Sequence, residues 1–149
     1  MYVAYTLLYL IGLCAYVPRA VWRIIRSGTN RSGISARFGK VPKDVADVQP
    51  GAIWIHADSV GEDTAARGLI GHLSRMLPEL PVVLSTTTDT GQAVAKKADT
   101  AACFYCPVDL PWAISPYLDS LQPRAIVLVE TAIWPNLLNS CNQRDIPIA

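Results

Sequence analysis

The sequence has few of the residues that bind metal ions or form disulfides. It contains two histidines and four cysteines, and Cys103 and Cys106 form its one closely spaced cysteine pair. A structural zinc site needs four ligands, so this pair would require two more from elsewhere in the chain. Small buried thiols in a reducing compartment explain the cysteines better. We therefore expect no metal ion and no other cofactor.

A long hydrophobic run is also missing. A membrane-spanning helix usually requires roughly 20 apolar residues, whereas the uncharged, mostly apolar run at the start covers residues 3–17. Pro18 and Arg19 follow this run, without the Ala-x-Ala pattern of a secretory cleavage site. A cleaved signal peptide and a buried helix stay open as alternatives. We favour an uncleaved membrane anchor or interfacial helix over residues 1–26.

The first 43 residues contain no acidic side chain. They hold seven cations, namely Arg19, Arg23, Arg26, Arg31, Arg37, Lys40 and Lys43. Residues 44–149 carry six Lys or Arg against twelve Asp or Glu, a net charge of −6. Cations beside an apolar segment are attracted to anionic lipid headgroups, at about 1 kcal/mol each. We assign Arg19, Arg23, Arg26, Arg31 and Arg37 to a lipid surface and residues 27–50 to a basic linker. A solvated charge run is the alternative, and the acidic remainder disfavours nucleic acid.

Beyond residue 50, short apolar runs alternate with helical patterns. Expected strands cover residues 52–56, 81–85, 102–106 and 125–129, and a last one begins at Ile146. Expected helices cover residues 61–76, 90–98, 112–121 and 133–143. The strands are apolar throughout, which is typical of strands that are covered on both faces. Residues 51–149 are therefore predicted to form an α/β domain with a parallel, doubly wound (Rossmann-like) sheet.

Two carboxylates mark a candidate site in this sheet. If the strands lie in the order 3-2-1-4, those that end at His56 and Val129 are neighbours, and their connections leave in opposite directions. Ligands bind in the crevice at such a switch point. Glu62 follows the first strand and Glu130 follows the fourth, so both flank the crevice. Glu62 could instead be a helix N-terminal charge, and Glu130 could accept hydrogen bonds from a neighbouring loop.

Four short motifs occur in order along this domain. They are His-Ala-Asp-Ser-Val-Gly-Glu at 56–62, Thr-Thr-Thr-Asp-Thr-Gly at 86–91, Pro-Val-Asp-Leu-Pro at 107–111 and Glu-Thr-Ala-Ile-Trp-Pro-Asn at 130–136. Together they resemble the N-terminal half of the 3-deoxy-D-manno-octulosonic acid (Kdo) transferases. The resemblance covers nearly the whole chain, including its apolar start.

The resemblance implies the first half of a two-domain, GT-B type glycosyltransferase of lipopolysaccharide core biosynthesis. Such an enzyme transfers Kdo from CMP-Kdo to a lipid A precursor, with inversion, at the cytoplasmic face of the bacterial inner membrane. The position of the general base matches Glu62, and Glu130 matches a supporting acidic position near the acceptor. The expected acceptor-binding residues are Ser59, Gly61, Thr86, Thr88 and Asp109.

The sequence departs from the family pattern in three respects. Asp58 stands where we expect a small or apolar residue, and Ala132 where an acidic one is common. The donor-binding half is absent and the last strand is cut at Ala149, so we expect a fragment that is inactive alone. A non-catalytic, membrane-bound lipid- or glycan-binding domain is one alternative. Another sugar-nucleotide-dependent glycosyltransferase is a second, since one fold hosts many functions.

Overall fold

Four apolar strands form the centre of the structure, which is a computed structural model. It describes residues 2–27, 31–58, 60–129 and 134–149, with the backbone alone for residues 3, 16–27, 31, 32, 60, 63 and 64. The strands are β1 (Ile53–His56), β2 (Val82–Thr86), β3 (Ala102–Tyr105) and β4 (Ala125–Leu128). They lie in the order β3-β2-β1-β4, and every pair is parallel. The predicted 3-2-1-4 order is confirmed.

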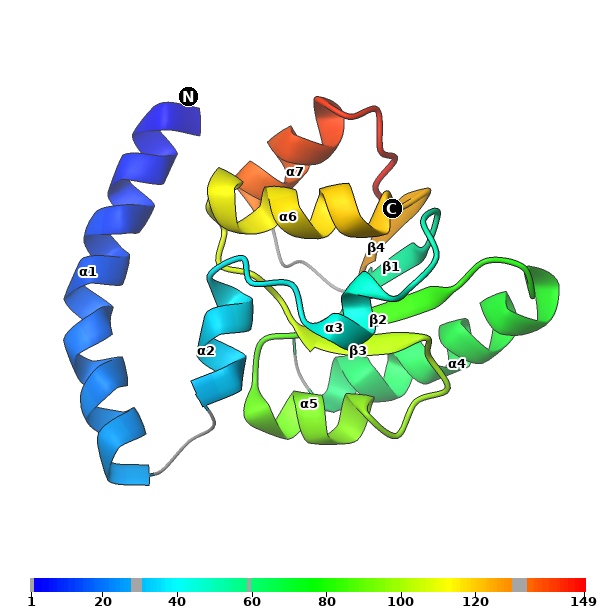
Figure 1. Cartoon of the computed structure of the whole chain (residues 1–149), viewed down its shortest axis with the longest axis horizontal. Helices are drawn as coiled ribbons and strands as arrows, with labels where there is room; N and C mark the ends of the chain where they lie inside the picture. Colours follow the sequence, from blue (N-terminus) through cyan, green and yellow to red (C-terminus); the bar gives the residue numbers. More distant parts are fainter. Residues whose placement is uncertain (1, 28–30, 59, 130–133) are drawn as a thin grey trace.

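Helices cover both faces of this sheet (Figure 1). They are α1 (Tyr2–Ser27), α2 (Arg31–Arg37), α3 (Lys43–Ala46), α4 (Val60–Met76), α5 (Asp89–Ala95), α6 (Pro111–Leu121) and α7 (Pro135–Asn142). On one face Ile55 and Leu84 of the strands pack against Ile70 of α4. On the other face Trp54 and Phe104 pack against α6 and α7. Because both faces are covered, β1 and β2 are buried along their whole length, as their apolar sequences predict.

The segment at residues 27–50 differs from the linker that the sequence led us to expect. It contains the short helices α2 and α3, which pack against the sheet and α6. Val45 and Val48 of this segment are buried in the core that contains Trp54. These two valines stand among polar neighbours, so the hydrophobic pattern alone gave no sign of an element. The folded unit therefore begins before residue 50.

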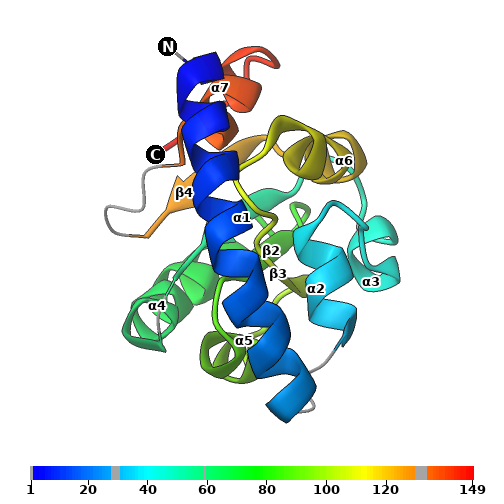
Figure 2. The same ribbon diagram turned by 90° about the vertical axis from the view of Figure 1, so that its left-hand side faces the viewer.

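The helix α1 lies on the outside of the domain, against α7 (Figure 2). Tyr5, Thr6 and Tyr9 face inward, because all three form hydrogen bonds with residues beyond 100. Leu10 and Leu13 are partly buried, whereas Leu8 and Ile11 are 69% and 66% exposed. No helix in the described ranges is both long and apolar enough to cross a membrane. The outward face of α1 is thus apolar, whereas the outward face of an ordinary surface helix is polar.

The last residues of the chain lie beside β4. Ile148 forms a single parallel bridge with Ile126, and the Ala149 N–H donates to the Ile126 carbonyl. The strand expected from Ile146 is therefore present as this one bridge.

Candidate active site

The carboxyl ends of β1 and β4 lie side by side, and the chain leaves them in opposite directions. After β1 it runs through α4 to β2, and after β4 it runs to α7 on the other face of the sheet. This arrangement is the switch point at which open α/β sheets bind ligands. The backbone N–H of Val129 donates to the carbonyl of His56 at 2.9 Å, which ties the two strand ends together.

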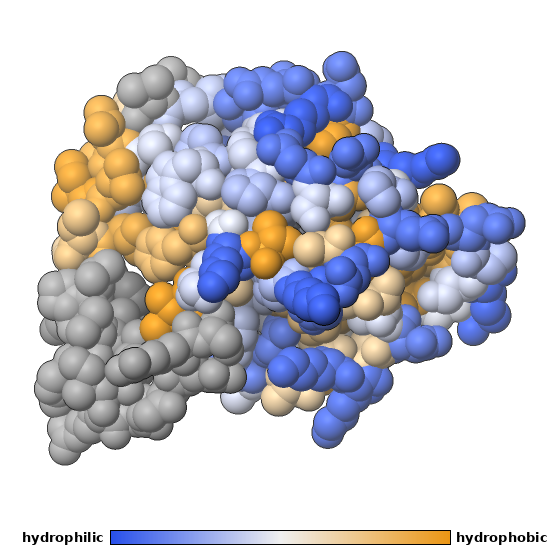
Figure 3. Space-filling view, in the orientation of Figure 1, coloured by the Kyte–Doolittle hydropathy of each residue, from blue (hydrophilic) through white to orange (hydrophobic). Residues whose placement is uncertain are grey.

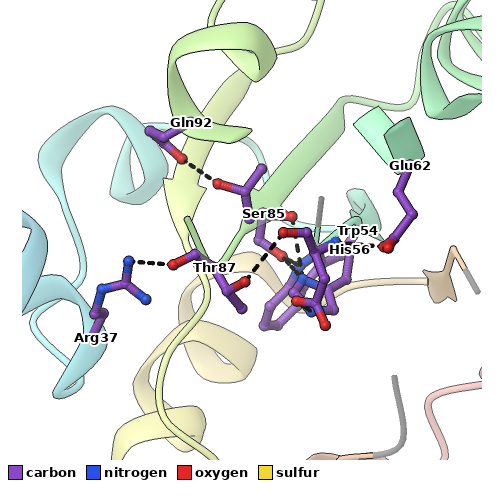
Figure 4. A network of polar contacts seen from close by, with 9 residues as sticks. Arg37, Trp54, His56, Glu62, Ser85, Thr87 and Gln92 are labelled. Carbon is purple, nitrogen blue, oxygen red and sulfur yellow. Dashed lines mark hydrogen bonds and ion pairs between the residues drawn. The ribbon is translucent and has the colours of Figure 1, made fainter. Parts of the chain in front are cut away.

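Glu62 lies in the first turn of α4, directly above the end of β1. Its side chain is half-buried, and its Oε2 accepts a hydrogen bond from the backbone N–H of Asp58 at 2.7 Å. A carboxylate at a helix N-terminus is favoured by the helix macrodipole. Figure 4 shows Glu62 at the edge of a polar network that extends toward β2. A structural contact and an accessible carboxylate therefore coexist at this residue.

His56 is the centre of that network, although it is only 1% exposed. Its Nδ1 lies 2.9 Å from Ser85 Oγ and 3.2 Å from the Ser85 carbonyl. Its Nε2 lies 2.9 Å from Asp58 Oδ1. Ser85 Oγ in turn accepts the Trp54 indole N–H at 2.7 Å. The buried end of β1 is thus linked to β2 and to the loop before α4 (Figure 4).

The surroundings of His56 favour its charged form. Burial disfavours the imidazolium, but the nearby Cys106 and the Asp58 carboxylate favour it more strongly and raise the pKa of His56 to about 10. In turn, the interaction with the His56 side chain and its charge lowers the pKa of Asp58. Both ring nitrogens face acceptors, as a doubly protonated ring requires. The 2.9 Å contact between Nε2 and Asp58 Oδ1 is an ion pair when the ring is doubly protonated.

The loop after β2 is held from the other side by α2. The Arg37 guanidinium donates to the carbonyl of Thr87 and lies 4.4 Å from the centre of the Tyr105 ring. Thr87 Oγ1 donates to the Asp58 carbonyl at 3.3 Å. Arg37 was expected at a lipid surface; it lies at the rim of the candidate site.

The predicted acceptor-binding threonines have local partners. Thr86 is buried, and its hydroxyl donates to Gln92 Oε1 at 2.9 Å. Thr88 is the N-cap of α5, where its Oγ1 accepts the Gly91 N–H at 3.0 Å. Gly61 is exposed at the start of α4. Of Gly61, Thr86 and Thr88, Thr86 is enclosed and the other two face solvent. Their contacts with an acceptor stay predictions.

Asp109 lies in a closed structural position. It is fully buried, and its carboxylate accepts hydrogen bonds from the N–H groups of Asn136 and Leu137 and from the Tyr5 hydroxyl. Burial raises the pKa of Asp109, and these hydrogen bonds partly offset that effect. The N-cap residue of α7, Trp134, forms no side-chain cap. Asp109 therefore caps α7 from another loop and also anchors α1.

Several predicted site residues lie outside the described residues. These are Ser59 and Glu130 themselves and the side chains of Arg19, Arg23, Arg26 and Arg31. Among the residues that are described, no group of three or more His, Cys, Asp or Glu could hold a metal ion.

Sequence reasoning missed the roles of His56 and Ser85, and it noted Asp58 only as a departure from the family pattern. One available signal was a polar residue at the end of each of two adjacent apolar strands. A second signal concerned α1: the spacing of Tyr5 and Tyr9 places two hydroxyls on one face of an apolar helix. Neither signal shows which partner the side chain meets, because that depends on strand register.

Known proteins are similar to this sequence over most of its length. The family model of 3-deoxy-D-manno-octulosonic-acid transferase (kdotransferase) matches residues 32–149. The 3-deoxy-D-manno-octulosonic acid transferase of Haemophilus influenzae is 34% identical over 125 residues, which is 83% of this chain and 29% of that protein. A probable mitochondrial 3-deoxy-D-manno-octulosonic acid transferase of Arabidopsis thaliana is 34% identical, over 85% of this chain and 28% of its own length. The Bordetella pertussis transferase is 32% identical, over 93% of this chain and 34% of its own length. The chain thus spans about a third or less of the relatives that it matches.

Proposed function

This chain belongs to the 3-deoxy-D-manno-octulosonic-acid transferase family, and we propose that it is the acceptor-binding part of an inverting glycosyltransferase. The donor is CMP-Kdo and the acceptor is a hydroxyl of a lipid A precursor. The observation that carries the proposal is the position of Glu62, a half-buried carboxylate at the switch point of a parallel sheet. Neither substrate requires a metal ion or a cofactor on this chain.

Glu62 serves as the general base. An alcohol is a weak nucleophile at neutral pH, and a positioned base that takes its proton accelerates attack by roughly 10²–10⁴-fold. The proton passes to the Glu62 carboxylate as the acceptor oxygen bonds to the anomeric carbon and CMP leaves. Glu130 acts as a supporting carboxylate, and Ser59, Gly61 and Thr88 contact the acceptor.

The outer face of α1 holds the chain at the inner membrane, on its cytoplasmic side. Figure 3 shows hydrophobic residues gathered along the described part of α1. Leu7, Leu8 and Ile11 are each more than half exposed, which is unusual for large apolar side chains on one helix face. Lys40 and Lys43 are exposed on the segment that follows α2. An interfacial helix of this kind inserts its apolar face among lipid headgroups.

Glu62→Gln tests the proposal. Gln keeps the size of the side chain but cannot take a proton, so we expect kcat to fall by about 10²-fold or more. The variant is placed in a chimera in which this chain replaces the matching region of the Bordetella pertussis relative. Transfer of radiolabelled Kdo to lipid A precursor is measured. The chain alone should transfer none, because both substrates must be aligned for reaction.

The matched control is Glu79→Gln, an exposed glutamate after α4, which should leave kcat unchanged. A Glu62→Gln chimera that turns over at the rate of the unmodified chimera contradicts the assignment of the base.

A further inference from the structure

Asp58 is held at three points at once. Its carboxylate oxygen Oδ1 lies 2.9 Å from His56 Nε2, and its carbonyl accepts the Thr87 hydroxyl at 3.3 Å. Its own N–H donates to Glu62 Oε2 at 2.7 Å. The first two contacts fix the backbone of Asp58, and the third uses that backbone to hold Glu62.

The partner of Asp58 cannot shift easily. His56 is the last residue of β1, which lies between β2 and β4. Its Nδ1 is hydrogen-bonded to Ser85 of β2. The Trp134 ring packs edge-on against the imidazole, with ring centroids 5.6 Å apart. Because these contacts fix the His56 ring, its contact with Asp58 fixes the loop before α4 relative to the sheet.

We propose that Asp58 is a positioning residue for Glu62: its side-chain contact with His56 fixes the backbone N–H that orients the Glu62 carboxylate. This inference rests on the proposed function, in which Glu62 is the base. A base acts efficiently only when it is held within about 0.5 Å and 10–20° of its productive geometry. An exposed glutamate samples several rotamers, whereas a hydrogen bond to Oε2 restricts the carboxylate to a narrow range. An apolar side chain at position 58 could not make this contact.

The contact is measured first in the chain as it stands. In the isotope-labelled 149-residue protein, NMR should detect a scalar coupling across the hydrogen bond between the Asp58 amide nitrogen and the Glu62 carboxyl carbon. Asp58→Ala should abolish this coupling and speed amide hydrogen exchange at position 58 at least tenfold. Asp58→Asn, whose side-chain oxygen can still contact His56 Nε2, should retain both signals. Asp119→Ala removes a carboxylate from an exposed ion pair with Arg144 and is the matched control, with both signals retained.

Two outcomes overturn the proposal. One is the absence of the coupling in the unmodified chain, and the other is its survival in Asp58→Ala with unchanged exchange. If Asp58→Ala fails to fold, judged by the dispersion of amide signals from the four strands, Asp58→Ser is tested by the same two signals. A coupling that survives in Asp58→Ser likewise overturns the proposal.

The Kdo-transfer chimera then links position to rate. Asp58→Ala should lower kcat about tenfold while KM for the acceptor changes less than twofold, and Asp58→Asn should restore most of the loss. An unchanged kcat in Asp58→Ala overturns the positioning role. If the unmodified chimera transfers no Kdo, or if Glu62→Gln leaves kcat unchanged, the proposed function fails, whereas the NMR signals still decide whether Asp58 positions Glu62.

Discussion

Glu62 and Asp109 are both carboxylates of family motifs, but their surroundings are opposite. Asp109 is fully buried and accepts three hydrogen bonds from α1 and α7, elements far away in the sequence. Glu62 is half-buried, and it accepts a hydrogen bond from a backbone N–H four residues away. A carboxylate that is enclosed by donors stabilises the fold, whereas one that is held locally and reached by solvent can accept a substrate proton. Membership of a motif therefore does not distinguish the structural carboxylate from the one that we propose to be catalytic.

The largest expected effect on stability is that of Asp109→Ala. This change leaves the buried N–H groups of Asn136 and Leu137 without their acceptor. Hydrogen bonds to a charged group contribute about 1.5–3 kcal/mol each, and unpaired buried groups add a further cost. We expect the free energy of unfolding in urea to fall by about 3 kcal/mol or more.

Glu62→Gln is the matched comparison for that measurement, and it should lower the free energy of unfolding by at most about 1 kcal/mol. Equal losses of stability in the two variants would remove the distinction between the two carboxylates.

The pH dependence of the free energy of unfolding tests the contribution of His56, which is linked to Glu62 through Asp58. Its pKa rises from an ordinary 6.5 to about 10 in the folded chain, because Cys106 and Asp58 outweigh burial. This stabilisation is therefore complete below about pH 6.5 and is lost as the pH rises toward 10. The lowered pKa of Asp58 gives the opposite dependence, with stabilisation lost as the pH falls below its ordinary 3.8.

The free energy of unfolding, measured from pH 5 to 9, should therefore decline above about pH 6.5. His56→Gln should flatten that decline, whereas His72→Gln, at an exposed position on α4, should leave it unchanged. A decline of equal size in His56→Gln would assign the pH dependence to other groups.

The smallest expected effect on stability is on the outer face of α1. Gln is a good helix former, so replacing Leu7, Leu8 and Ile11 by Gln should change the free energy of unfolding by less than about 0.5 kcal/mol at each site. Binding to vesicles of phosphatidylethanolamine and phosphatidylglycerol should be lost. Tyr5→Phe, on the inner face, should cost about 1 kcal/mol and keep vesicle binding. Vesicle binding that persists in the triple variant contradicts the proposed membrane surface.

The sheet was predictable from the sequence, and the polar contacts were not. Uniformly apolar strands predict burial on both faces, which holds for β1 and β2, whereas β4 is fully buried only at Ile126. Alternation of strands with helices predicts parallel pairing. The pairing of His56 with Ser85 depends on the register of β1 on β2, which no local pattern specifies. Asp109 was assigned to acceptor binding because its motif is near others at the sheet edge, yet its partners come from residues 5, 136 and 137. Long-range hydrogen bonds leave little trace in a single sequence.

The contact between α1 and α7 also sets an order of events during synthesis. Thr6 donates to Asn136, a partner 130 positions later in the chain. At about 5–20 residues per second the ribosome needs roughly 7–26 s to make that partner. During this interval the Thr6 hydroxyl has no partner on α7, while the apolar outer face of α1 is already complete. We therefore expect α1 to reach the lipid surface before the sheet exists, so that the domain folds against a helix already at the membrane.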